Sequence, residues 1–307
     1  MDIAFISGVI AGSYSKLLTP SHLKNFENIS RKDFLALLKT HQYGFASDLS
    51  IDLIMLEEEK KHRQFLESVM DKDHLVFKVL YLNFDHLFLS SLMKSHQLGL
   101  KYQKPIDGLS NFNEARYETY IIDETMGLLD LEDKAFLDQL IAETKDLDAQ
   151  GISDRVIKIL HDRILQSIDK KTDPYVLKHF DFETTLLNIM LIIRSNKYNK
   201  DIKYVENNIL DGGMIEKHIL RDLFDQSIVD IGKYLSLHFD ERLTELFKYV
   251  DRPDFLAKLK DGFDLFMDDL LEDLSFQNMN LGPLIGFTIL KRREIENLKQ
   301  RYFQIKE

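Results

Sequence analysis

The sequence predicts an all-α protein, and three observations support this prediction. Leu, Lys, Glu, Asp and Phe dominate the 307 residues, whereas only 13 are glycine and 5 are proline, a composition that favours helices over many short strands. Apolar residues recur at helical spacing in nearly every part of the chain. The breaks are short, contain Gly or Pro, and lie at 104–111, 148–154, 208–214 and 278–283. We therefore expect one helix after another, with strands few or absent.

Several helix starts can be placed in chain order from their capping residues. Ser30 opens one helix, with Asp33 as the acidic residue of its first turn, because Ser accepts bonds from free backbone N–H groups and an acid suits the positive end of the helix dipole. Leu49 begins the apolar side of a longer helix that continues through the charged run EEEKKH. Asp173 and Pro174 open another, since Pro is favoured at the first helical position.

Two stretches one hundred residues apart end in the same way. LMKSHQLG at 92–99 and IIRSNKYN at 192–199 each carry a cation, then Ser, and finish on Gly99 or Asn199. A similar ending at 37–44 is explained by capping chemistry alone, because cations and left-handed Gly or Asn residues are common at helix C-termini. The later pair continues to match downstream, through Lys-Tyr and Asp-Gly. We interpret 75–109 and 175–214 as copies of one helix–turn unit, in which Lys94 should superpose on Arg194 and Gly99 on Asn199.

A repeat near one third of the chain length predicts three modules rather than a short-period solenoid. The approximate divisions are 1–109, 110–205 and 206–307, and the modules can interleave. A chain of 307 residues also exceeds the usual size of a single core.

Charge and composition exclude several functions. The net charge of −11 disfavours nucleic acid as a main partner, because phosphates require a basic face. The chain has no cysteine, and hence no disulfide or thiolate chemistry. Asp2 stands where a signal peptide would be basic, and no run of eighteen apolar residues occurs. We expect a soluble, cytoplasmic protein without a membrane span.

The sharpest candidate for an enzyme site is DDLLED at 268–273. Asp268, Asp269, Glu272 and Asp273 place carboxylates on neighbouring helical turns, the spacing by which all-helical isoprenoid synthases hold Mg²⁺. Such enzymes need a second metal motif downstream, and the chain ends 34 residues later without a basic loop for the diphosphate. We therefore expect a solvent-facing acidic helix, no metal and no catalytic residue, with a metal-dependent isoprenoid-type enzyme kept as the alternative.

Two weaker motifs also have structural explanations. Glu59 and His62 have the Glu-x-x-His spacing of di-iron bundles, but a second such pair is missing, so we expect an exposed histidine on a charged helix. Gly8 and Gly12 form GxxxG without the Lys-Ser/Thr of a phosphate-binding loop. These glycines are expected to permit close helix packing. Nothing in the sequence predicts a cofactor.

The C-terminal segment 280–305 resembles the closing helix of the C subunit of bacterial and archaeal V/A-type rotary ATPases, called subunit d in vacuolar ATPases. The residues that match that family's ending are Gly282, Pro283, Leu284, Phe287, Lys291, Glu294, Ile295, Asn297, Leu298 and Lys299. This chain departs at two positions, with Arg292 where the family commonly has Glu and Lys299 where it has Arg.

Other segments are similar to the same family in order and spacing. GVIAGSYSKLLTPSHLKNF resembles its opening helix, and ILDGGM its Gly-Gly turn. The two repeated units resemble its acidic-x-x-Asn … cation pattern. One unit has Asp85 but lacks the Asn, and the other has Asn188 but lacks the acid.

The resemblance implies a non-catalytic mechanical subunit. Three similar helical modules in pseudo-threefold arrangement would form a funnel on the cytoplasmic face of the membrane rotor ring, receive the tip of the central stalk and pass torque between them. A generic helical adaptor remains a further alternative.

The basic part of the last helix has two interpretations. Its cations pair with the chain's own carboxylates, or they contact the stalk or the ring, and on the second interpretation the candidate contact residues are Lys291, Arg292, Arg293, Glu294, Asn297 and Lys299. Because exposed pairs contribute little stability, reversing the charge of Arg292 and Arg293 should leave the melting temperature almost unchanged.

Overall fold

The structure, a computed structural model, describes residues 2–44, 50–122, 129–238 and 280–305, together with residues 241, 247, 248, 252, 255, 259 and 271. Every regular element within these residues is a helix, which confirms the all-α prediction. The helices are α1 (Ile3–Ser13), the short 3₁₀ turn η1 (Tyr14–Lys16), α2 (Pro20–Lys24), α3 (Arg31–Thr40), α4 (Ile51–Val69), α5 (Leu75–Leu80), α6 (Leu82–Leu98), α7 (Glu114–Ile122), α8 (Leu131–Thr144), α9 (Ala149–Ser167), α10 (Pro174–Lys197), α11 (Ile202–Asn208), α12 (Lys217–Phe224), α13 (Ile228–His238) and α16 (Gly282–Gln304).

The structure confirms the predicted helix starts at Ser30 and Asp173. The Ser30 hydroxyl accepts a hydrogen bond from the Asp33 N–H at 3.1 Å and caps α3. Asp173 caps α10, with Pro174 as its first residue. Leu49 lies outside the described residues, and α4 is capped by Ser50 instead. These starts follow from local chemistry, because each cap satisfies backbone N–H groups that the first helical turn leaves free.

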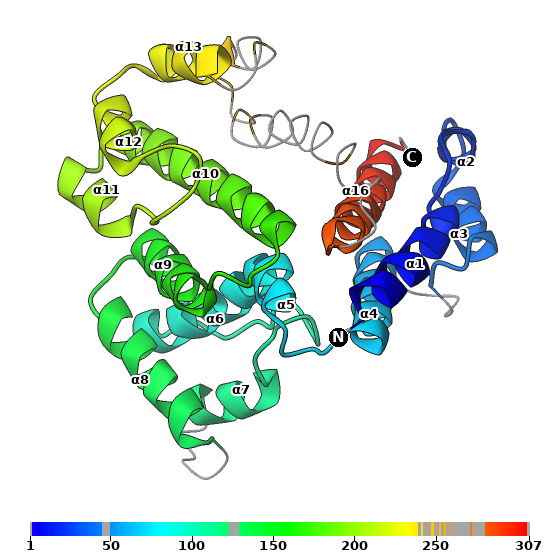
Figure 1. The fold of residues 1–307 in the computed structure, drawn as a ribbon, viewed down its shortest axis with the longest axis horizontal. Helices are drawn as coiled ribbons and strands as arrows, with labels where there is room; N and C mark the ends of the chain where they lie inside the picture. Colours follow the sequence, from blue (N-terminus) through cyan, green and yellow to red (C-terminus); the bar gives the residue numbers. More distant parts are fainter. Residues whose placement is uncertain are drawn as a thin grey trace.

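The helices form three neighbouring groups (Figure 1). In the first, α2, α3 and α4 share an apolar cluster with the last turns of α16. The second and largest cluster joins α5 to α9, and it takes in the first parts of α1, α10 and α16. The third lies between α10, α11, α12 and α13. The division into three similar modules stays a prediction, and so does their pseudo-threefold arrangement.

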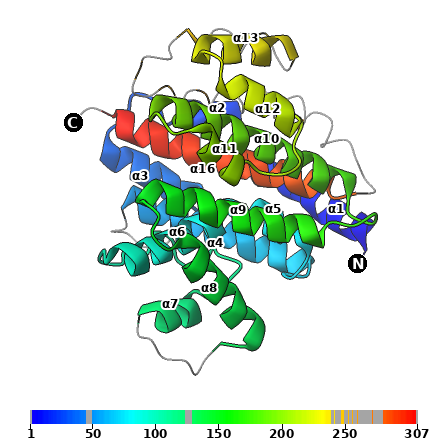
Figure 2. The ribbon, with the colours of Figure 1, turned by 90° about the vertical axis from the view of Figure 1, so that its left-hand side faces the viewer.

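The last described helix packs beside the earliest ones. α16 lies against α1 and α4, and its beginning also contacts α10. Figures 1 and 2 both place α16 next to α1, although the two helices are separated by most of the sequence. The fold is therefore closed by contacts between its first and last helices.

The two repeated helix ends show related local geometry. Gly99 after α6 has φ of 62° and Asn199 after α10 has φ of 51°, the left-handed conformation that ends many helices. Arg194 of α10 pairs with Asp154 of α9 at 3.0 Å. Lys94 of α6 lies within electrostatic reach of the same carboxylate. Arg194 is thus paired with Asp154, while the superposition of Lys94 on Arg194 stays a prediction.

Each unit also uses a buried polar side chain to hold the loop that returns along its long helix. Asp85 of α6 accepts hydrogen bonds from the Ser110 hydroxyl at 2.7 Å and from the Asn111 backbone at 2.6 Å. Asn188 of α10 both donates to and accepts from the Leu210 backbone, at 3.1 and 2.8 Å. Backbone groups buried in these loops therefore find partners on the helix, as buried polar groups must.

The expectation for Gly8 and Gly12 is wrong. Both glycines are exposed on α1, and a Cβ added at either position would meet no atom within 4 Å. They therefore permit no close helix contact with the residues that the structure describes. The apolar side of α1 that packs into the molecule carries Ile6 and Ile10 instead.

Gly99 and Gly213 allow the cost of a left-handed backbone to be separated from the cost of steric crowding. Gly99 and Gly213 both have positive φ, but a Cβ at Gly99 would meet nothing, whereas at Gly213 it would lie 2.9 Å from the Thr185 Oγ1 and 3.3 Å from the Thr185 N. We expect Gly99→Ala to lower the free energy of unfolding by about 1–2 kcal/mol through left-handed strain. Gly213→Ala should cost a further ~1–3 kcal/mol through crowding. Urea unfolding measures both, and equal losses would contradict the assignment.

Candidate functional site

The C-terminal helix α16 is the candidate functional element, and its first turns are anchored inside the molecule. The Leu281 N–H donates to Asp173 at 2.8 Å, and the Tyr14 hydroxyl donates to the Pro283 carbonyl at 3.0 Å. Leu284 and Ile285 are buried between α1, α4 and α10. Pro283 suits the first turn because its missing N–H would have had no helical partner.

Lys291 lies at the centre of a buried polar cluster. Its ammonium group donates to the Tyr43 hydroxyl and to Glu294, both at 2.8 Å, and lies 3.2 Å from Glu58 of α4. Glu294 also accepts from the Tyr43 hydroxyl and from the Leu18 N–H. Burial, together with Glu294, raises the pKa of Tyr43 well above its ordinary value. The phenol therefore stays protonated and donates a hydrogen bond to the Glu294 carboxylate.

Arg292 connects α16 to the neighbouring helices. Its Nε donates to Glu59 of α4 at 2.7 Å, and its Nη1 donates to the carbonyl oxygen of Leu80, the last residue of α5, at 2.6 Å. The guanidinium lies over the rings of Tyr81 and Phe84, 4.7 and 5.2 Å from their centres. Such a planar cation both pairs with a carboxylate and stacks on aromatic faces. We call Tyr43, Glu58, Glu59, Lys291, Arg292 and Glu294 the α16 clasp.

The structure corrects two expectations about these residues. His62 is buried, not exposed, and its Nε2 lies 3.1 Å from the Thr288 hydroxyl. Burial lowers the pKa of His62 to about 3, and the charges of Arg292 and Lys291 act in the same direction. Arg292 is likewise not an exposed cation. The expectation that its charge can be reversed without loss of stability therefore has no structural support.

Of the six predicted contact residues, three are engaged inside the chain and three remain at or near the surface. Lys291, Arg292 and Glu294 form the clasp, as the self-pairing interpretation requires. Arg293 is partly exposed, and Asn297 is exposed. Lys299 pairs with Asp52 at 2.7 Å on the surface. Contact of any of these six with a partner stays a prediction.

A groove runs beside the exposed half of α16. It has a volume of about 890 Å³. The lining residues are mainly polar: Phe26, Glu27, Asn28, Ile29, Asn297, Gln300, Arg301, Gln304 and Ile305. Asn297 therefore connects the predicted contact set to a hollow between α16 and the α2–α3 turn.

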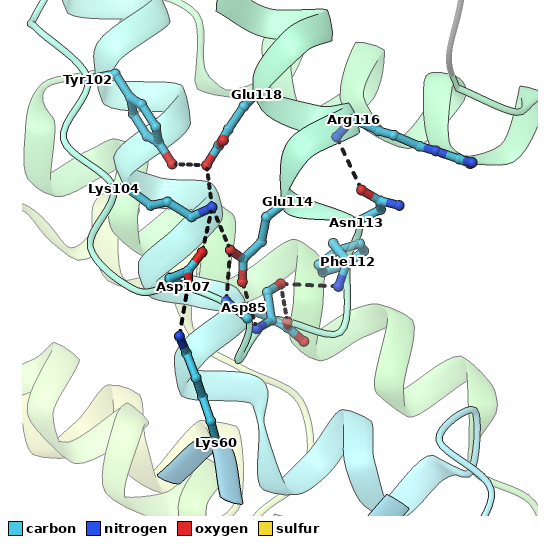
Figure 3. Close-up of polar contacts among 12 residues, drawn as sticks. Lys60, Asp85, Tyr102, Lys104, Asp107, Phe112, Asn113, Glu114, Arg116 and Glu118 are labelled. Atoms are coloured by element: carbon cyan, nitrogen blue, oxygen red, sulfur yellow. Dashed lines mark hydrogen bonds and ion pairs between the residues drawn. The ribbon is translucent and has the colours of Figure 1, made fainter. Parts of the chain in front are cut away.

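A second ionic cluster stiffens the loop before α7 (Figure 3). Lys104 lies 3.0 Å from Glu114 and 3.1 Å from Asp107, and Asp107 also pairs with Lys60 of α4 at 2.9 Å. Glu114 in turn accepts from the backbone of Gly108 at 3.1 Å. The break predicted at 104–111 is thus an ordered loop held between α4 and α7.

The acidic motif at 268–273 falls largely outside the described residues, including all four of its carboxylates. Within the residues that the structure does describe, no three His, Asp or Glu side chains are placed to hold a metal ion. Glu59 of the Glu-x-x-His motif is engaged by Arg292. No described helix is long and apolar enough to cross a membrane.

Sequence reasoning did not identify the acidic half of the clasp. Glu58 and Glu59 belong to the run EEEKK, which predicts a solvated face rather than partners for a helix more than 200 residues later. In the sequence, Tyr43 stands only as part of the helix ending at 37–44. One feature of the sequence points to this pairing. The last helix of an acidic chain carries an excess of cations, and such cations need carboxylates elsewhere in the chain as partners.

Comparison with known proteins identifies a family for this chain. The family model of the ATP synthase (C/AC39) subunit matches residues 6–300, almost the whole chain. A search of curated proteins finds no match. The family match extends from α1 to the exposed half of α16, and so includes every residue of the clasp. This chain therefore belongs to the ATP synthase (C/AC39) subunit family, a family of subunits of V/A-type ATPases.

Proposed function

We propose that the chain is the non-catalytic central-rotor subunit of a V/A-type ATPase. In this role it is a socket that links the central stalk to the membrane rotor ring, peripheral to the membrane on its cytoplasmic face. It transmits torque during ATP-driven ion transport or ATP synthesis. Membership of the family supports this role. So does the all-helical fold, in which the described contacts of α16 hold it against other helices of the chain.

The α16 clasp is the observation that carries the proposal. A part that transmits torque must deform little under load. Helices that only touch through apolar side chains can slide, whereas buried ion pairs and hydrogen bonds have one favourable geometry. Arg292 fixes α16 to α4 and α5 together, and Lys291 fixes it to Tyr43 after α3. Force applied to α16 therefore reaches the first two helix groups directly.

The exposed half of α16 is the proposed contact surface. Asn297 and Lys299 face outwards, and the groove beside Asn297 offers amide groups from Asn28, Gln300 and Gln304. Amides donate and accept hydrogen bonds, so this groove suits a polar polypeptide such as a stalk helix. Lys291, Arg292 and Glu294 then act from inside, by holding the contact surface in place.

Reconstitution tests the proposal. Membranes that carry the ATPase but lack this chain should hydrolyse ATP without moving ions, and purified chain should restore ATP-driven transport. Proton uptake can be followed with a pH-sensitive dye and sodium uptake with radioactive sodium. The variant Asn297→Ala/Gln300→Ala should bind and couple more weakly, whereas Lys32→Gln, an exposed change on α3 outside the groove lining, serves as the control.

Two outcomes would contradict the proposal. Full transport without the chain would exclude a coupling role and favour a generic adaptor. Mg²⁺-dependent turnover of an isoprenoid diphosphate by the purified chain would support the enzyme alternative based on 268–273.

A further inference from the structure

One end of the molecule combines exposed lysines with exposed apolar side chains. We call it the lysine end, and its members are Leu98, Leu100, Lys101, Lys145, Lys197, Tyr198 and Lys203. Leu100 is 54% exposed and Tyr198 is 60% exposed. Large apolar side chains left in water beside a set of cations are unusual on a chain with a net charge of −11.

Side-chain contacts bring these segments together. Gln97 near the end of α6 donates to the Ile141 carbonyl at 2.8 Å and to the Thr144 hydroxyl at 3.3 Å, so the ends of α6 and α8 meet. Lys200 after α10 pairs with Asp148 at the start of α9 at 2.9 Å. α8, α9 and α11 lie along one side of the molecule (Figure 1). The lysine end is therefore one surface made by four helices and their turns.

The acids near this surface are mostly engaged. Asp148 caps α9 and pairs with Lys200, and Asp154 binds Arg194 and the Tyr204 hydroxyl. Asp201 caps α11, and Asp146 stays exposed. Lys101, Lys145, Lys197 and Lys203 make no ion pair with the residues that the structure describes. The lysine end is thus locally positive, although the whole chain is acidic.

We propose that the lysine end binds the surface of a lipid bilayer that contains anionic phospholipids. Exposed lysines are attracted to an anionic headgroup layer. The exposed leucine side chains and the exposed tyrosine suit the headgroup region. The exposed charges at this surface are four lysines without an ion-pair partner among the described residues, against the exposed carboxylates of Asp146 and Asp201, so the net local charge is positive. Lys is also depleted in protein–protein interfaces. The chemistry therefore fits a phosphate-rich lipid surface better than a folded acidic partner. This inference goes beyond the proposed function, because it assigns a membrane contact to the chain itself.

Co-sedimentation of the purified chain with vesicles tests the inference. We expect binding to phosphatidylcholine vesicles that contain phosphatidylglycerol, little binding to phosphatidylcholine alone, and release at high salt. The variant Lys101→Glu/Lys145→Glu/Lys197→Glu should bind at least about tenfold more weakly. Lys24→Glu/Lys32→Glu/Lys72→Glu changes the net charge equally at exposed sites on or beside α2, α3 and α4, and it should keep most of the binding.

A second variant separates the apolar contribution from charge. Leu100→Ser/Tyr198→Ser leaves every charge in place and should weaken binding to anionic vesicles, with a helical circular dichroism spectrum like that of the unchanged chain. Equal binding to both vesicle types, or equal losses in the two lysine variants, would overturn the inference. So would capture of the chain by soluble polyglutamate in preference to vesicles. The assay contains no other ATPase subunit, so its outcome is independent of the rotor role.

Discussion

Replacing Arg292 with Ala is expected to lower the free energy of unfolding by about 3 kcal/mol, the lower end of the usual cost of removing one partner of a buried ion pair, because Glu59 is buried whereas the Arg292 side chain is 28% exposed. The loss is large because Glu59, only 5% exposed, would keep its charge without Arg292. The Leu80 carbonyl and the faces of Tyr81 and Phe84 would also lose their cation. Urea unfolding followed by circular dichroism measures the change.

Lys299→Ala is the matched control on the same helix. Its partner Asp52 is exposed, so the pair should be worth about 0–1 kcal/mol. The double variant Arg292→Met/Glu59→Met should recover part of the loss of Arg292→Ala, because it leaves no buried charge unpaired. If Arg292→Ala were no worse than Lys299→Ala, the clasp would not stabilise the fold.

The free energy of unfolding is expected to fall steeply as the pH drops below about 6.5. Burial lowers the pKa of His62 to about 3, and those of His86, His161 and His179 to about 4. These histidines stay neutral in the folded chain but take up protons near pH 6.5 once it unfolds. Because the unfolded state binds more protons between pH 6.5 and 4, stability is lost as the pH falls through that window. Each histidine should contribute a loss of about 2 kcal/mol at pH 5.

Asp85 acts in the opposite direction. Burial raises the pKa of its carboxyl to about 6, so the folded chain binds that proton more tightly than the unfolded chain. Protonation of Asp85 therefore offsets part of the loss of unfolding free energy that the four histidines cause at low pH. Urea unfolding at pH 7.5 and pH 5 measures the net effect, and His62→Gln, whose amide can still reach Thr288, should reduce the pH dependence. Equal stability at the two pH values would contradict the assignment of four neutral histidines, three of them buried and His86 partly buried.

Local chemistry made much of the fold predictable. Ser30 and Asp173 mark helix starts because an N-cap acts on its own first turn, and Gly99 and Asn199 mark helix ends because few residues accept positive φ. Such signals depend on neighbours in the sequence. The all-α fold class and these helix boundaries therefore follow from the sequence alone.

The candidate site could be predicted only in part. Lys291 and Arg292 were recognised on α16, but charged residues are usually solvated, so burial could not be inferred without the carboxylates that compensate them. Those carboxylates are far away in the sequence, with Arg292 and Glu59 separated by 233 residues. The expectation of an exposed His62 is wrong for the same reason. Its neighbours in the sequence are charged, whereas its neighbours in space are Thr288 and the ring of Phe287.

The clasp also has a consequence for how the protein is made. The ribosome synthesises Glu58 and Glu59 long before Lys291 and Arg292, so a nascent chain carries the acidic half of the clasp without its cations. The apolar sides of α1 and α4 that later contact α16 are also uncovered during that interval, which is when unfinished domains are prone to aggregate. Translation that stops before residue 291 would release a polypeptide unable to complete its first helix group. Quality control could therefore distinguish finished from unfinished chains by whether the last helix has docked.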